Sequence, residues 1–193
     1  MKPLLLNNPF FRPLLYVFAN VGLFVLGWKS KGRMPDIKKF ILVAAPHSSN
    51  WDFIYFLLVI FKLQIPVHWI AKKSMFFWPF TGLLERLGGI SIDRSQKGNL
   101  VVGMVDTINK AERLIITIAP SGTRKKVTHW KTGFYQIASQ ANIPIVFGFV
   151  DYKRKTSGIG PMLLPTGDMD ADMMTIKAFY KDKSGRYDDK QPE

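Results

Sequence analysis

The sequence predicts an α/β fold: a single domain with a mainly parallel central sheet flanked by helices. Three apolar runs, 40–45, 114–119 and 145–150, show no alternation with polar residues, which is typical of strands buried on both faces. Segments of helical character separate these runs, as the connections between parallel strands require. The length of 193 residues also fits one domain.

Residues 1–35 are expected to form a helical segment that docks on a membrane. The apolar run Leu14–Trp28 has Arg12 before it and Lys29 and Lys31 after it. The run is about 15 residues long, whereas a helix that spans a bilayer needs about 20. An apolar helix with cationic ends suits an interface with anionic headgroups. An ordinary buried N-terminal helix is the alternative.

The α/β domain is expected over residues 36–181, followed by a polar, charge-balanced and solvated tail over 182–193. Its strands are the continuous apolar runs, and its helices are the longer apolar or amphipathic segments that begin after turn residues. Pro79 should break the second helix. In chain order we expect a strand at 39–45, a helix at 51–63, a strand at 67–71, a helix at 74–87, a strand at 90–93, a helix at 99–112, a strand at 114–119, a helix at 130–142, a strand at 145–150, a short strand at 162–164 and a helix at 170–180.

The composition limits the kinds of partner and of catalytic group that we expect. Lysine and arginine number 27 against 14 acidic residues, a net charge of +13, so we expect an anionic partner such as a lipid surface or a phosphorylated substrate. Nucleic acid is disfavoured, because the aromatic residues lie inside apolar runs rather than among basic residues. The absence of cysteine excludes a disulfide framework and a cysteine nucleophile. The three histidines have no metal-site spacing, so no metal is expected.

The first candidate site is the turn that holds His47 and Asp52, directly after a predicted strand. Five steps along a regular helix leave two side chains about 140° apart. The two side chains therefore meet only if His47 lies in the turn and Asp52 in the first turn of the next helix. Asp52 would then orient one ring nitrogen and leave the other as a base. A structural capping contact is the alternative.

The second candidate site is the turn 119–126, which combines Ser121, Gly122 and Thr123 with three cations that begin at Arg124. Exposed backbone N–H groups next to cations suit a phosphate, although a solvated basic turn has the same composition. The spacing is neither that of a P-loop nor that of a serine-nucleophile elbow.

Two further cations could reach an anion. Arg94 ends a short strand in a third turn, where Asp93 offers a surface ion pair instead. Lys72 follows another strand, and with Lys73 it has a solvated pair as its alternative.

Four short blocks follow one another along residues 47–146, about half of the chain. They are His47-x4-Asp52, Gly89-x-Ile-x-Ile-Asp-Arg94, Pro120-x-Gly-Thr-Arg124 and Ile143-Pro144-Ile145-Val146. Their order and approximate spacing resemble those of the glycerophospholipid acyltransferase family, whose best-known members are the lysophosphatidate acyltransferases. The N-terminal apolar helix also resembles the membrane-docking helix of that family.

The resemblance implies acyl transfer to a lysophospholipid-type acceptor such as 1-acylglycerol-3-phosphate. His47 would deprotonate the acceptor hydroxyl, Asp52 would orient His47, and the alkoxide would attack the thioester of acyl-CoA or acyl-carrier protein, with no cofactor. Lys72 would reach a phosphate of the acceptor or of the donor. The family also implies a peripheral or monotopic enzyme at the cytoplasmic face of the cell membrane. The acceptor phosphate would be held by Arg94, Ser121, Gly122, Thr123 and Arg124.

The sequence departs from the family at one position, because Ser121 stands where the third block usually has glutamate. The missing carboxylate raises the positive charge around Arg124, which leaves a different lyso-lipid headgroup open as the acceptor. A non-catalytic module that binds lipid surfaces and retains the fold is the second alternative.

Overall fold

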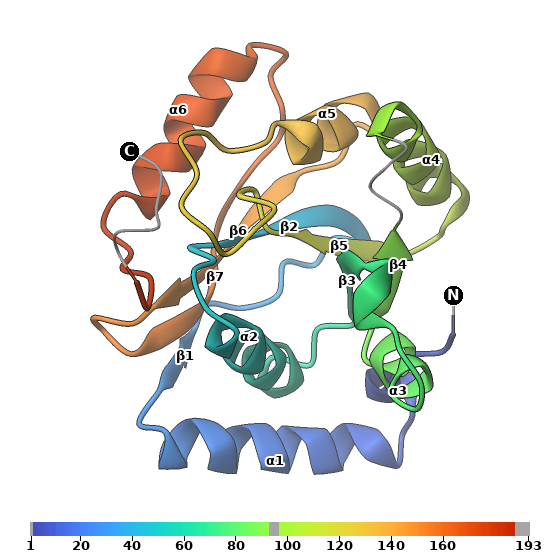
Figure 1. The fold of residues 1–193 in the computed structure, drawn as a ribbon, viewed down its shortest axis with the longest axis vertical. Coiled ribbons are helices and arrows are strands. Elements are labelled where there is room, and N and C mark those ends of the chain that lie inside the picture. Colours follow the sequence, from blue (N-terminus) through green and yellow to red (C-terminus); the bar gives the residue numbers. More distant parts are fainter. Residues whose placement is uncertain (1, 93–96, 188–193) are drawn as a thin grey trace.

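The computed structural model describes residues 2–92 and 97–187 (Figure 1). The α-helices are α1 (Phe11–Val25), α2 (Trp51–Lys62), α3 (Thr81–Arg86), α4 (Lys97–Lys110), α5 (Gly133–Gln140) and α6 (Met169–Tyr180), and the short 3-10 helices are η1 (Leu5–Asn7) and η2 (Lys73–Met75). The strands are β1 (Lys29–Lys31), β2 (Lys39–Ala45), β3 (Val67–Lys72), β4 (Gly89–Ile92), β5 (Leu114–Ile118), β6 (Ile145–Asp151) and β7 (Thr156–Leu163).

The described residues form one sheet of seven strands in the order β1-β7-β6-β2-β5-β3-β4. Neighbouring strands are parallel except β6 and β7, which are antiparallel. The α/β class and the mainly parallel sheet are therefore confirmed. In the centre, Val43 of β2 pairs with Ile118 of β5 and with Phe147 of β6. The segments that follow β2, β5 and β6 consequently emerge at one edge of the sheet.

Helices cover both faces of this sheet (Figure 1). Helices α4, α5 and α6 lie on one face, while α2 lies on the other and α1 lies outside α2. Successive residues of β2 alternate between the two cores: Phe40 and Leu42 face the α2 side, and Ile41 and Val43 face the α5 side. Burial on both faces explains the unbroken apolar run of this strand.

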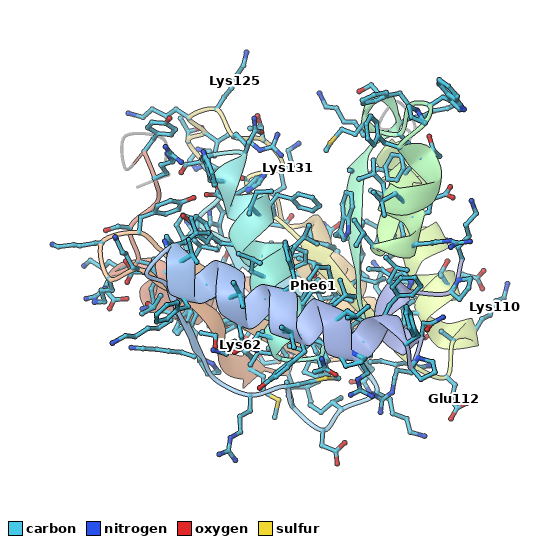
Figure 2. All side chains as sticks on the ribbon, turned by 90° about the horizontal axis from the view of Figure 1, so that it is seen from below. Phe61, Lys62, Lys110, Glu112, Lys125 and Lys131 are labelled. Atoms are coloured by element: carbon cyan, nitrogen blue, oxygen red, sulfur yellow. The ribbon has the colours of Figure 1, made fainter. Side chains whose placement is uncertain are left out.

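Helix α1 packs on α2 with one side and leaves the other side open. Ala19 and Leu23 are buried, and Gly22 lies so close to α2 that a Cβ there would come within 3.0 Å of the Leu58 side chain. In Figure 2 this helix crosses the front of the molecule. Its exposed apolar residues include Leu14, Val17, Phe18, Val21, Phe24 and Val25. Within 2–92 and 97–187, no helix has both the length and the apolar character needed to cross a bilayer.

The end of α1 fixes the position of Trp28. Gly27 has φ +70, the left-handed conformation that a glycine adopts without a steric penalty. The Trp28 N–H donates to the Leu23 carbonyl at 2.8 Å and the Gly27 N–H to that of Phe24 at 3.0 Å, which is the Schellman arrangement. The chain therefore turns sharply, and the Trp28 ring enters the core beneath α2.

Two strands differ from the expectation. Strand β1 was not predicted, because its three residues, Lys29–Lys31, carry no apolar pattern and are held only by parallel pairing with β7. Strand β7 covers Thr156–Leu163 rather than 162–164. Its glycines at 158 and 160 break the apolar pattern from which a strand is predicted. Both positions need glycine in the folded chain, because a Cβ at either would come within 2.5 Å of another atom.

Two helix predictions were also wrong in extent. Residues 74–87 do not form one broken helix: only η2 and the short α3 are helical, and the aromatic stretch 76–80 lies between them. The predicted helix 130–142 is reduced to α5, since residues 130–132 remain part of the loop that follows β5. Both differences lengthen the loops at the edge of the sheet where the candidate site lies.

Candidate active site

The turn after β2 brings His47 and Asp52 together. Asp52 lies in the first turn of α2, and His47 lies in the turn before it. The Nδ1 atom of His47 is 3.4 Å from Oδ2 of Asp52. The Asp52 side chain is only 4% exposed, whereas that of His47 is 22% exposed. The carboxylate is thus buried behind a ring whose Nε2 remains available to another group.

Burial and hydrogen bonds together determine whether the Asp52 carboxylate is ionised. Its Oδ2 accepts hydrogen bonds from the backbone N–H groups of Ser48 at 2.7 Å and Ser49 at 2.8 Å. Its Oδ1 accepts a hydrogen bond from the Tyr152 hydroxyl at 2.6 Å. Burial alone would raise the pKa of Asp52, but hydrogen bonds from His47, Tyr152 and Ser49 outweigh burial and lower the pKa below its ordinary value. Asp52 is therefore ionised at neutral pH.

A cavity of about 1030 Å³ lies next to His47 and Asp52. Both His47 and Asp52 line it, at the carboxyl edge of the sheet where open α/β folds bind ligands. The remaining wall is largely apolar and comes from helices α2, α4 and α5 and from strands β2 to β7. Its apolar members include Phe53, Phe56, Trp69, Ile70, Leu100, Val101, Phe134 and Ile137. A cavity of this size and character suits an acyl chain next to a polar head.

The loop after β5 supplies cations to the polar end of the cavity. Gly122, Thr123 and Arg124 line it, as does Lys131 a few residues further on. The Nε of Arg124 is buried and has no hydrogen-bond partner among the described residues. A buried donor without a partner is costly, so this position suits an incoming acceptor such as a phosphate oxygen.

Gly122 adopts φ +64 in this loop. The Lys131 side chain lies over it: a Cβ on Gly122 would come within 3.0 Å of Lys131 Nζ. Figure 2 shows Lys125 and Lys131 near the end of α2 that is opposite Lys62, which is the end with the His47 turn.

The structure brings most of the predicted site residues to one cavity. His47, Asp52, Lys72, Gly122, Thr123 and Arg124 all line it. Ser121 is turned inward instead: it is buried, and its hydroxyl donates to the carbonyl of Thr123 at 2.8 Å. It therefore holds the loop rather than facing the cavity. Arg94 lies outside the described residues.

Sequence reasoning missed Tyr152 and Lys131. Tyr152 is 100 residues from Asp52, and no local pattern connects the two. The available signal was topological: Tyr152 follows β6, which pairs with β2, so the two strands end at the same edge. Lys131 was recognisable only as one more cation after the basic loop.

The first residues of the tail expected over 182–193 also contact the turn that carries His47. The Tyr187 N–H donates to the Ser48 hydroxyl at 3.3 Å. The guanidinium of Arg186 lies 5.4 Å from the centre of the Trp51 ring. The described part of the tail thus contacts both ends of the turn that carries His47.

Comparison with known proteins identifies the family. A family model described as Acyltransferase matches residues 29–147, more than half of the chain. The 1-acyl-sn-glycerol-3-phosphate acyltransferase of Haemophilus influenzae is 28% identical over 132 residues, which cover 63% of this chain and 53% of that protein. The chain thus spans about half the length of this curated relative.

A solved structure agrees in fold. The crystal structure of the 1-acyl-sn-glycerophosphate (LPA) acyltransferase PlsC from Thermotoga maritima matches with a TM-score of 0.61 over 91% of this chain and 82% of that chain, at 16% identity. This likeness concerns the fold, whereas the match of the family model over residues 29–147 shows that the chain belongs to the glycerophospholipid acyltransferase family.

Proposed function

We propose that the protein transfers a fatty acyl group from the thioester of acyl-CoA or acyl-carrier protein to the hydroxyl of a lysophospholipid, with 1-acylglycerol-3-phosphate as the first candidate acceptor. The observation that carries this proposal is the His47 ring, backed by the ionised Asp52 and open to a largely apolar cavity with cations at its polar end. The family and the name of the Haemophilus influenzae relative support the same reaction.

His47 acts as the general base. Because Nδ1 faces Asp52, Nε2 accepts the proton of the acceptor hydroxyl. The resulting alkoxide oxygen attacks the thioester carbonyl carbon and forms a new C–O bond. The tetrahedral intermediate collapses with cleavage of the C–S bond, and the leaving thiolate takes the proton from the imidazolium. The negative charge of Asp52 stabilises that imidazolium while the intermediate exists. No group of the enzyme is acylated.

Cations at the polar end of the cavity hold the phosphate of the acceptor. Arg124 offers its buried Nε, and Lys131 lies over Gly122 in the same loop. Thr123 lines the cavity beside them, and Lys72 approaches from β3 with a charge that suits a phosphate of the acceptor or of the donor. The hydroxyl of Ser121 donates within the loop and does not face the cavity. Serine in place of the family's glutamate therefore changes the charge near Arg124, but the serine adds no ligand to the cavity.

We also propose that α1 docks the enzyme on an anionic membrane surface. Its exposed side carries apolar residues, including Phe18 at 62% and Phe24 at 85% exposure. Exposed cations lie near both ends, with Arg12 in the first turn of the helix and Lys29 after its last turn. A second exposed apolar group, Phe77, Trp78, Phe80 and Leu83, follows the cavity residue Met75 along the chain. We place the enzyme peripherally at the cytoplasmic face, where anionic lipids attract basic segments.

The test is acyl transfer by the purified full chain on anionic vesicles. Labelled acyl-CoA or acyl-carrier protein is the donor, and lysophosphatidate and other lysophospholipids are the acceptors. His47→Ala should lower the rate by about 10²–10⁴-fold, as expected for the loss of a general base. His129→Ala is the matched control, because His129 is an exposed histidine of the neighbouring loop and does not line the cavity.

Each other outcome points to a different conclusion. Activity that survives His47→Ala would refute the assignment of the base. Transfer to another lysophospholipid but not to lysophosphatidate would favour a different headgroup. No transfer to any acceptor, with vesicle binding intact, would favour the non-catalytic lipid-binding module.

A further inference from the structure

We infer that Tyr152 is a positioning residue for the pair His47 and Asp52, because its hydroxyl determines which carboxylate oxygen faces the histidine. This inference rests on the proposed function. The Tyr152 hydroxyl donates to Oδ1 of Asp52 at 2.6 Å, and the Ser48 and Ser49 N–H groups donate to Oδ2. Both oxygens are thus held from opposite sides, and Oδ2 is the one that lies 3.4 Å from His47.

The Tyr152 ring is itself fixed by aromatic neighbours. Its centre is 5.0 Å from that of Trp28 and 5.6 Å from that of Tyr55, and both contacts are edge-to-face. Trp28 and Tyr55 stack on each other at 3.8 Å. The backbone N–H of Tyr152 donates to the Ser184 carbonyl at 2.9 Å. With the ring and the backbone both held, the hydroxyl oxygen is fixed beside Asp52, and its O–H donates to Oδ1.

The chemistry of the contact requires a neutral hydroxyl beside an ionised carboxylate. Burial and the neighbouring Asp52 raise the pKa of Tyr152 far above its ordinary value, so the hydroxyl remains a donor at every working pH. Tyr152 does not line the cavity, so it acts on the reaction only through Asp52. Without the hydroxyl, Oδ1 of the buried Asp52 loses its donor. The Ser48 and Ser49 N–H groups keep the carboxylate beside the His47 ring, but its orientation is held less firmly.

Loss of the hydroxyl also changes the charge that the His47 ring experiences. A carboxylate with one donor fewer keeps more of its negative charge uncompensated. That charge favours the protonated imidazole, which cannot act as a base. A variant without the hydroxyl should therefore need a higher pH to reach its full rate, in addition to having a lower maximum rate.

The test replaces Tyr152 by phenylalanine, which keeps the ring and its aromatic contacts. We expect kcat to fall by about ten- to a hundredfold, the range for losing a hydrogen bond to a charged group, with KM for the acceptor and donor little changed. The acid limb of the kcat/KM profile should move to higher pH. The probes are labelled acyl-CoA or acyl-carrier protein and whichever lysophospholipid the wild type accepts.

Tyr135→Phe is the matched control. The Tyr135 hydroxyl donates to the buried carboxylate of Asp172 at 2.8 Å, and that carboxylate also accepts the Thr166 N–H at 2.8 Å. The contact is of the same kind as that of Tyr152, but it lies away from His47, and Tyr135 does not line the cavity. Both variants should lose a similar amount of thermal stability, and only Tyr152→Phe should change kcat and the pH profile.

A second readout needs no substrate. The ring signals of His47 are assigned in the NMR spectrum by their loss in His47→Ala, and they are then followed against pH. Tyr152→Phe should shift this titration, whereas Tyr135→Phe should leave it unchanged. Equal titrations and equal kcat for Tyr152→Phe and the wild type would overturn the inference, even if the variant melts at a lower temperature. Activity that survives His47→Ala would instead refute His47 as the base, and the absence of any acyl transfer by the wild type would refute the proposed function. In both cases the NMR titration would still decide the role of Tyr152.

Discussion

The side chain of Lys131 lies directly over Gly122, so that a Cβ on this glycine would come within 3.0 Å of Lys131 Nζ and 3.2 Å of its Cδ and Cε. The glycine therefore permits two things at once: the left-handed backbone of the loop, with φ +64, and the close approach of a cation to the polar end of the cavity.

Gly122→Ala should destabilise the protein by about 1 kcal/mol or more and raise KM for the acceptor, because both the backbone and Lys131 must move. Gly103→Ala is the control: Gly103 lies within α4, where a Cβ would meet no atom within 4 Å, so that variant should gain about 0.5–1 kcal/mol. Urea unfolding and acceptor titrations measure both effects. An unchanged KM for Gly122→Ala would show that Lys131 does not contribute to acceptor binding.

The ionised form of Asp52 should contribute to stability in a pH-dependent way. Its pKa in the folded protein lies below its ordinary value of 3.8. A lowered pKa means that this stabilisation is fully present above about pH 4 and is lost as the pH falls through the folded-state pKa.

Asp52→Asn should lack this contribution, so that the difference in unfolding free energy between wild type and variant should shrink as the pH is lowered from about 6 to about 3. Asp36→Asn, at an exposed carboxylate, should show a smaller change over the same range. Urea unfolding at several pH values gives the comparison. A constant difference for Asp52→Asn would contradict the lowered pKa.

Vesicle binding should depend on the exposed side of α1. The double substitution of Phe18 and Phe24 by serine removes two of its apolar side chains, and neither residue lines the cavity. We expect binding to anionic vesicles to fall by about tenfold or more, since burial of an aromatic side chain contributes roughly 1.5–3 kcal/mol. Binding of the wild type should also weaken as salt is added.

Met174→Ser is the control for this experiment. Met174 is 73% exposed on α6, which covers the opposite face of the sheet from α1. Co-sedimentation with vesicles should be the same for this variant and for the wild type. Equal binding by the α1 variant would mean that another surface makes the contact.

A buried hydroxyl at the cavity wall offers a further test. The Oγ1 of Thr117 is buried and has no hydrogen-bond partner among the described residues. Thr117→Val keeps the shape and removes this polar atom, so it should stabilise the fold by about 1 kcal/mol and leave acyl transfer intact. Thermal unfolding measures the change, and a clear loss of stability would show that the hydroxyl has a partner in solution.

Strongly patterned segments could be predicted, and long-range ones could not. Strands β2, β5 and β6 are apolar along nearly all of their length and were recognisable from that alone. Strand β1 consists of three polar residues, and its conformation depends on pairing with β7, more than a hundred residues away. The aromatic stretch 76–80 has enough apolar residues for a helix, but in the folded chain it forms an exposed turn.

In the candidate site too, local contacts could be predicted and long-range contacts could not. The contact between His47 and Asp52 is local, so the turn residues between them were enough to predict it. The inward orientation of Ser121 depends on a bond to the Thr123 carbonyl that residue type does not reveal. The role of Tyr152 follows from sheet order, which puts the end of β6 beside the end of β2.

The position of α1 outside α2 has a consequence for any shortened form of the protein. Helix α2 is enclosed between the sheet and α1, and accordingly its side chains are apolar around most of its circumference. A recombinant fragment that began at residue 36 would lose α1, β1 and the ring of Trp28 together, and it would uncover Leu58 and Tyr55. Such a fragment should self-associate through α2, so attempts to make the protein easier to handle should replace the outward side chains of α1 and retain the helix.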